Sequence, residues 1–218
     1  MEKALSETES LKIITEMIGK AKNSYHEKGI GPMLWGSVIT VCSLVSFFRI
    51  RYNFKLPFDI WLLTLVAIIP QIILSVQEKR TRKVRSYNDD AMDYIWMCFG
   101  VAIFLLVHIN TNLMGVLNKV FNDYKALGGE LPDFIYSSFS TSMFLLLYGI
   151  PTIITGGIMK FKPMLYGGIL CWTCCIITVY TNIKVDLLLT AFSAMGAWLI
   201  PGIILWIRYK KEETTKNV

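Results

Sequence analysis

Cys171 and Cys174 form a C-x-x-C pair, the pattern in this chain that comes closest to a known chemistry. Such a pair can cycle between dithiol and disulfide, which would suggest thiol redox activity. However, all five cysteines fall inside long apolar segments, and no exposed cysteine pair is available to pass electrons on. We therefore interpret the cysteines as small, polarizable core residues.

Other catalytic patterns are absent from the sequence. It has no G-x-S-x-G, no H-E-x-x-H, no P-loop and no metal-ligand spacing of Cys, His or carboxylates. Asp59, Asp133 and Asp186 stand at the starts of apolar segments, where a carboxylate suits a helix N-terminus. The sequence thus predicts a protein that is not an enzyme and has no catalytic residue, cofactor or metal.

Three prolines inside apolar segments are the strongest candidates for function. The pattern Ile-Pro-x-Ile-Ile occurs at 69–73, 150–154 and 200–204, each time with a lysine nine residues after the proline. An intrahelical proline frees the carbonyl four residues earlier, so the three sites could be hinges or a ring of carbonyls around a path. Neighbouring helices can instead satisfy such carbonyls, which would make the prolines ordinary kinks. The candidate hinge and pathway residues are Pro70, Gln71, Pro151, Thr152 and Pro201.

The segments that must position these residues are long and apolar. The 218 residues are 54% hydrophobic and only 17% charged, whereas a soluble domain has roughly 25% charged residues. We predict an all-α membrane protein with six transmembrane helices at 30–49, 57–77, 92–110, 134–159, 163–182 and 186–207. A cytoplasmic amphipathic helix (1–28) precedes this six-span bundle (29–208), and a polar cytoplasmic tail (209–218) follows it.

Basic residues give the orientation. With the N-terminus inside, 16 of the 22 Lys and Arg residues fall on the cytoplasmic side, as the positive-inside rule requires. Both termini are then cytoplasmic, in a multi-pass protein of the bacterial inner membrane. The net charge of +6 is accounted for by these span ends facing anionic headgroups, and nucleic acid is not an expected partner.

The N-terminal segment carries one apolar stripe. Its members recur at spacings of three and four residues after a capping box formed by Ser6 and Glu9. The stripe could lie on the lipid bilayer or dock a protein partner at the cytoplasmic face. Its residues are Leu11, Ile14, Ile18, Ala21 and Tyr25.

An internal repeat groups the spans in pairs. PMLWGSVI from Pro32 resembles PMLYGGIL from Pro163, and in each case an Ile-Pro-x-Ile-Ile proline follows 38 residues later. The six spans therefore read as three hairpins, a pattern that would make them parallel repeats about an axis along the membrane normal.

The segments EMIGKAKNSYHEKGIGPMLWG, FKPMLYGG and LIPG, with six apolar spans, resemble small multi-span membrane proteins of Bacteroidetes-type bacteria. That resemblance implies no activity. The leading hypothesis is a regulatory, sensory or accessory component of the inner membrane, acting alone or as a homo-oligomer. The alternative is a small-molecule transporter or channel with a path along the hairpin axis, gated near the three prolines.

Overall fold

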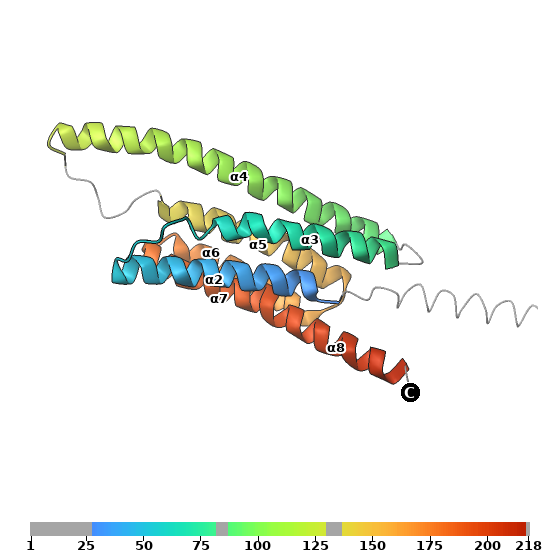
Figure 1. Ribbon diagram of the computed structural model, residues 1–218. Helices are drawn as coiled ribbons and strands as arrows, with labels where there is room; N and C mark the ends of the chain where they lie inside the picture. The colour runs from blue at the N-terminus through green and yellow to red at the C-terminus, as the bar shows by residue number, and fades with distance from the viewer. Residues whose placement is uncertain (1–27, 82–86, 130–136, 217–218) are drawn as a thin grey trace, which may run out of the picture.

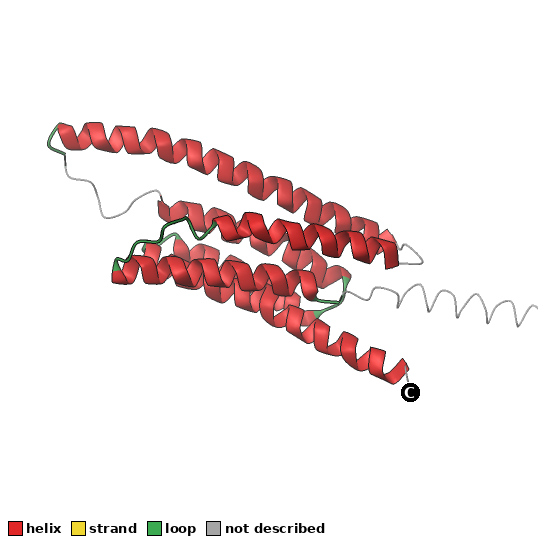
Figure 2. Cartoon of the chain, in the orientation of Figure 1, coloured by secondary structure: helices red, strands yellow, loops and turns green. Residues whose placement is uncertain are grey.

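The computed structural model describes residues 28–81, 87–129 and 137–216. Regular structure in these residues is helical throughout, with turns and short loops between the helices (Figure 2). The prediction of an all-α protein is therefore confirmed for the described ranges. The predicted docking stripe at residues 11–25 lies outside them.

Five stretches of the described chain are long and apolar enough to cross a membrane. Four of them lie in α2 (Ile30–Tyr52), α3 (Leu62–Thr81), α4 (Tyr87–Ala126) and α5 (Ser137–Ile158). The fifth is a continuous helical rod formed by α7 (Ile183–Ala194), a π-helical turn η1 (Met195–Leu199) and α8 (Ile200–Lys216). These lengths and compositions are those of a multi-pass membrane protein.

The predicted fifth span corresponds to the shorter helix α6 (Lys162–Thr178). At 17 residues it is about 25 Å long at 1.5 Å per residue, somewhat less than the other candidates. Pro163 stands in its first turn, where the missing backbone N–H costs no hydrogen bond. Along the chain, successive helices alternate in direction (Figure 1).

The helices form a packed core with two peripheral members. Helices α5 and α6 pack against each other in the most extensive contact, and α2, α5 and α6 each pack against the α7–η1–α8 rod. Among the described helices, α3 packs its backbone only against α2, and α4 only against α5. Figure 1 shows α4 along one side of the bundle. In each of the three predicted hairpins the two helices contact each other. The backbones of α3 and α4, which belong to different hairpins, do not pack together.

The interior is centred on α5, α6 and the rod. Its fully buried side chains include Leu145, Met164, Cys171 and Ala197, and Tyr148 and Trp198 add two large aromatic rings. The C-x-x-C cysteines Cys171 and Cys174 are both buried in this cluster and are free thiols. They thus occupy the packing role expected of them in the sequence.

Helix α4 differs from the sequence prediction. A span at 92–110 was expected, but one helix runs from Tyr87 to Ala126. Its 40 residues measure about 60 Å, and its end projects beyond the other helices (Figure 1). The physical reason is that the apolar spacing of three and four residues continues past 111 with no proline. The helix ends only at the Gly128–Gly129 pair, where Gly128 has φ +81°.

Candidate functional site

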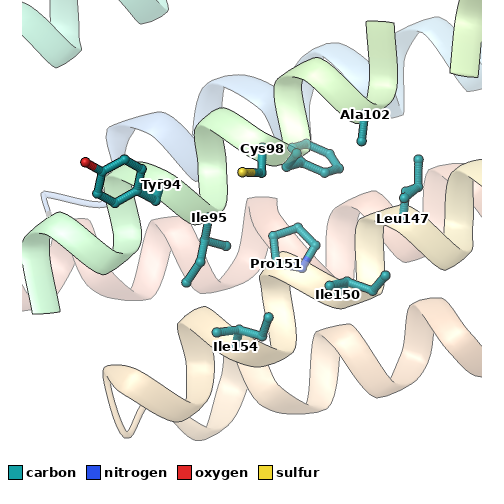
Figure 3. A pocket seen from close by; sticks show the side chains of 9 residues that line it. Tyr94, Ile95, Cys98, Ala102, Leu147, Ile150, Pro151 and Ile154 are labelled. Atoms are coloured by element: carbon teal, nitrogen blue, oxygen red, sulfur yellow. The ribbon is translucent and has the colours of Figure 1, made fainter. Parts of the chain in front are cut away.

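A pocket of about 330 Å³ lies between α4 and α5. Side chains of both helices converge on it, as Figure 3 shows, with Ile95 and Cys98 on α4 opposite Pro151 and Ile154 on α5. The remaining lining residues are Tyr94, Phe99, Ala102, Leu147 and Ile150. Nearly all of these groups are carbon, so the pocket suits an apolar ligand rather than an ion or a sugar.

The α4 wall of the pocket packs its backbone against α5 alone among the described helices. Trp96 and Phe99 reach from α4 toward Trp198, with ring centroids 6.3 and 6.1 Å from its ring. Ser140 on α5 donates a hydrogen bond to the Asn110 side chain at 2.7 Å. Lys79 on α3 pairs with Asp93 at 3.2 Å, with both side chains exposed, and such a pair contributes about 0–1 kcal/mol. The wall can therefore move at lower cost than any helix of the core.

One turn of α5 joins the pocket to the core. Pro151 lines the pocket, while the next residue, Thr152, is fully buried on the core side. Thr152 Oγ1 accepts a hydrogen bond from Trp198 Nε1 at 2.8 Å and donates one to the Tyr148 carbonyl at 2.6 Å. The Tyr148 and Trp198 rings lie 4.8 Å apart. This arrangement is dry and fully bonded, so the Thr152 hydroxyl does not face an open space.

The structure brings only some of the predicted pathway residues near one another. Pro151 and Thr152 lie on α5, where Thr152 bonds to Trp198 of η1. Pro201 follows Trp198 by three residues and lies in the first turn of α8. Pro70 and Gln71 lie on α3, away from α5 and α8. The Gln71 side chain is directed at Gly31 on α2 and donates to Ser75 Oγ at 3.4 Å. The three prolines thus do not surround a common axis.

A π-helical turn lies just before Pro201 in the structure, and the sequence did not predict it. The five residues before Ile200 form a π-helical turn, in which the Ile200 N–H donates to the Met195 carbonyl. A π turn shifts the hydrogen-bond pattern by one residue, which accommodates a proline that cannot donate. Trp198, which bonds to Thr152 of α5, lies within this turn.

Asp186 lies in the first turn of α7, at a helix N-terminus as the sequence predicted, but it is not the capping residue. Asn182 is the N-cap of α7 and accepts from the N–H groups of Lys184 and Val185. Asp186 lies one turn further along, fully buried, and accepts a hydrogen bond from Thr181 Oγ1. Its second oxygen, Oδ2, has no hydrogen-bond partner. Only the burial of this part of α7 distinguishes it from Asp59, which is exposed and accepts from the Trp61 N–H as a cap does.

The described residues bring together no group of three or more His, Cys, Asp and Glu side chains of the kind that binds a transition metal. No protein-family model, curated protein or solved structure matches the chain. The described residues are those of an all-helical protein with five membrane-crossing candidates, and the function must be argued from the site alone.

Proposed function

We propose that the chain is a six-span protein of the bacterial inner membrane that binds an apolar chain from the bilayer between α4 and α5, as a sensory or regulatory component. Both termini would be cytoplasmic, and α6 would be the fifth span. One observation carries the proposal: a carbon-lined pocket of about 330 Å³ lies between α5 and the peripheral helix α4. The size falls in the range typical of ligand sites, roughly 300–1,000 Å³.

The occupant we expect is a lipid acyl chain. The pocket lies on the side of the bundle, between two helices that are each apolar and long enough to cross a membrane. Its lining offers almost no hydrogen-bond partner, so a ligand with buried polar groups would lose their hydration without compensation. The Tyr94 hydroxyl is the polar group of the lining, and Lys79 and Asp93 lie near this end of α4, where a headgroup would be held.

The transporter alternative has weaker support. A central path would require the three prolines and the polar side chains beside them to meet, but Gln71 faces α2 and Thr152 is bonded to Trp198. A regulator, in contrast, needs a closed interior and one element that can change position. Helix α4 fits that need because it is long, peripheral and joined to the core through few side chains.

Photo-crosslinking tests the pocket. The purified full-length protein is placed in nanodiscs with a phospholipid that carries a diazirine on one acyl chain, and the crosslinked peptides are mapped by mass spectrometry. We expect crosslinks to concentrate on residues 94–102 and 147–154. Ala102→Trp should fill the pocket and reduce them at least fivefold, because Ala102 lines it.

The neighbouring residue provides a matched control. Val101 is exposed and does not line the pocket, so Val101→Trp should leave the crosslinking pattern unchanged. Crosslinks spread evenly around the bundle, or equal loss in both variants, would show ordinary lipid contact and contradict the proposal.

The regulatory role also needs a partner at the cytoplasmic face, for which the N-terminal stripe is the candidate. Leu11→Asp combined with Ile14→Asp places two charges on that stripe, and we expect it to abolish capture of a protein partner while leaving the bundle folded. Unchanged capture together with unchanged protection of the segment by membranes would remove the stripe from the proposal.

A further inference from the structure

Small polar side chains gather where α2 packs along α7. Three hydroxyl residues on α2 (Thr40, Ser43, Ser46) and three polar residues on α7 (Asp186, Thr190, Ser193) are all buried. Helix α2 makes its most extensive contact with α7. A buried polar row at the main contact of two helices in a protein with this many apolar residues needs a reason. We call these six residues the polar seam.

The register of the two helices places the two halves of the polar seam opposite each other. The helices are antiparallel: a Cβ on Gly36 would lie 2.4 Å from the Leu199 nitrogen, and one on Gly202 would lie 2.7 Å from the Met33 nitrogen. Continuing this register toward the start of α7 brings Ser43 level with Ser193, and Ser46 level with Thr190, to within a residue. Asp186 follows one turn beyond Thr190 on the same face of α7.

Most oxygens of the polar seam have no hydrogen-bond partner. Thr190 Oγ1 donates to the Asp186 carbonyl at 2.8 Å, as a helical threonine commonly does. The oxygens without a partner are Thr40 Oγ1, Ser43 Oγ, Ser46 Oγ, Ser193 Oγ and Asp186 Oδ2. These five make up most of the orphaned side-chain oxygens and nitrogens in the described residues. They are concentrated in one interface, and polar partners bound along it, one of them at Asp186, would explain this concentration.

The partner that the Asp186 carboxylate requires has the properties of a cation. Asp186 is fully buried and forms no ion pair in the described chain, although Arg49 lies near its level on α2 and is half-buried. A buried carboxylate without a counter-charge is strongly unfavourable. The neighbouring groups are hydroxyls, which offer neutral oxygen ligands, and oxygen is the ligand that hard cations prefer. With one carboxylate, a singly charged ion gives a neutral site.

We propose that the polar seam between α2 and α7 binds one Na⁺ ion at Asp186 Oδ2, with a water that joins the ion to the Ser46 hydroxyl one turn away and further waters bonded to the hydroxyls beyond it. The seam is about 10 Å long, since it covers two turns of α7, so one ion cannot contact all six residues. Water is the natural second occupant because each site offers several polar partners. The seam ends where Gly36 brings α2 against the backbone of Leu199.

This site is separate from the lipid pocket and does not depend on the proposed function. The pocket is formed by α4 and α5, whereas the polar seam belongs to α2 and α7. Failure of the crosslinking experiment would leave the Na⁺ site untouched. Failure to bind Na⁺ would likewise leave the proposed lipid pocket untouched.

Equilibrium binding of ²²Na⁺ to the purified full-length protein tests the proposal. Choline chloride replaces NaCl at constant ionic strength, so that only the identity of the cation changes. We expect saturable binding of about one ion per chain. Asp186→Asn keeps the shape of the side chain and removes its charge, and should weaken binding at least tenfold. Asp59→Asn is the matched control, because Asp59 is an exposed carboxylate at the start of α3, and it should bind Na⁺ as the wild type does.

A second variant remains informative even if Asp186→Asn does not fold. Ser46→Ala removes a buried hydroxyl that lacks a partner, so in choline it should be at least as heat-stable as the wild type. In NaCl, ligand binding should raise the melting temperature of the wild type and raise that of Ser46→Ala less. A structural role alone would give the same difference between the two proteins in both salts.

Three outcomes would overturn the proposal: no saturable Na⁺ binding by the wild type, equal binding by Asp186→Asn, or equal stabilisation of Ser46→Ala and the wild type by Na⁺. A melting temperature that responds to pH but not to Na⁺ would identify a proton on Asp186 in place of the ion.

Discussion

Gly36 of α2 and Gly167 of α6 both lie against the backbone of the π-helical turn η1. Replacing either glycine with alanine should destabilise the bundle. A Cβ on Gly36 of α2 would lie 2.4 Å from the Leu199 nitrogen, and one on Gly167 of α6 would lie 2.4 Å from the Ala197 Cα. In both cases the obstructing atom belongs to the backbone, which cannot rotate away as a side chain can. Gly36→Ala and Gly167→Ala therefore force the helices apart.

The expected magnitude follows from these distances. Non-bonded carbon atoms pack at about 3.5–4.0 Å, so each added methyl group requires a separation of about 1 Å or more. Overpacking of this kind typically costs about 1–3 kcal/mol. In a chain of this size, each kcal/mol lowers the melting temperature by about 2–4 °C. We expect similar losses for the two variants, since each added atom also meets a second backbone atom: Gly196 O at 2.7 Å for Gly167, and Leu199 Cα at 2.8 Å for Gly36.

Thermal unfolding of the purified variants in one detergent measures this loss. Gly100 on α4 is the matched control, because a Cβ there meets nothing within 4 Å. Gly100→Ala should leave the melting temperature unchanged or raise it slightly, as alanine favours a helix over glycine by about 1 kcal/mol. If Gly36→Ala and Gly167→Ala behaved like Gly100→Ala, the close approach of α2 and α6 to η1 would be refuted.

Three further comparisons test the core by the same unfolding measurement. Leu145→Ala removes a fully buried side chain and should cost about 2–5 kcal/mol, whereas the exposed neighbour Leu146 should tolerate alanine within about 0.5 kcal/mol. Trp198→Phe removes the hydrogen bond to Thr152 and should cost about 1 kcal/mol; no loss would contradict the bond. Thr155→Val removes an orphaned hydroxyl and should be neutral or stabilising, whereas Thr152→Val should destabilise, and the reverse order would contradict both assignments.

The sequence predicts the helices well where one physical cause dominates. Pro32 and Pro163 stand in the first turns of α2 and α6, as the preference of proline for such positions implies. Apolar length alone locates the long helices, because a helix satisfies its backbone hydrogen bonds within one segment, as lipid requires. The end of α4 was misplaced because polar residues after Asn110 lower the hydropathy without interrupting the helical spacing. Hydropathy reports where a helix leaves the membrane, and not where it ends.

The candidate sites were harder to predict from the sequence, because each of them is formed by side chains of two different helices. Nothing in the neighbourhood of Thr152 indicates that Trp198, 46 positions later, would donate a hydrogen bond to it. The burial of Asp186 likewise depends on α2, which precedes it by more than a hundred residues. A spacing of four and three residues links Asp186, Thr190 and Ser193 on one face of α7, and this periodicity was the signal that could have found the polar seam.

The π-helical turn is the element that connects the two proposed sites. Ser193 of the polar seam lies two residues before Met195, where the turn begins, and Trp198 within the turn bonds to Thr152. The residue before Thr152, Pro151, lines the lipid pocket. A change in hydrogen-bond register between Met195 and Ile200 would therefore rotate Trp198 and alter the α5 wall of the pocket. An ion at Asp186 could affect lipid binding only if it favours one of two registers, because a ligand shifts an equilibrium only by its difference in affinity for the two states. The close contacts of Gly36 and Gly167 with η1 oppose such a change of register. Coupling between the two sites would therefore require these contacts to loosen, which would lower the stability of the bundle.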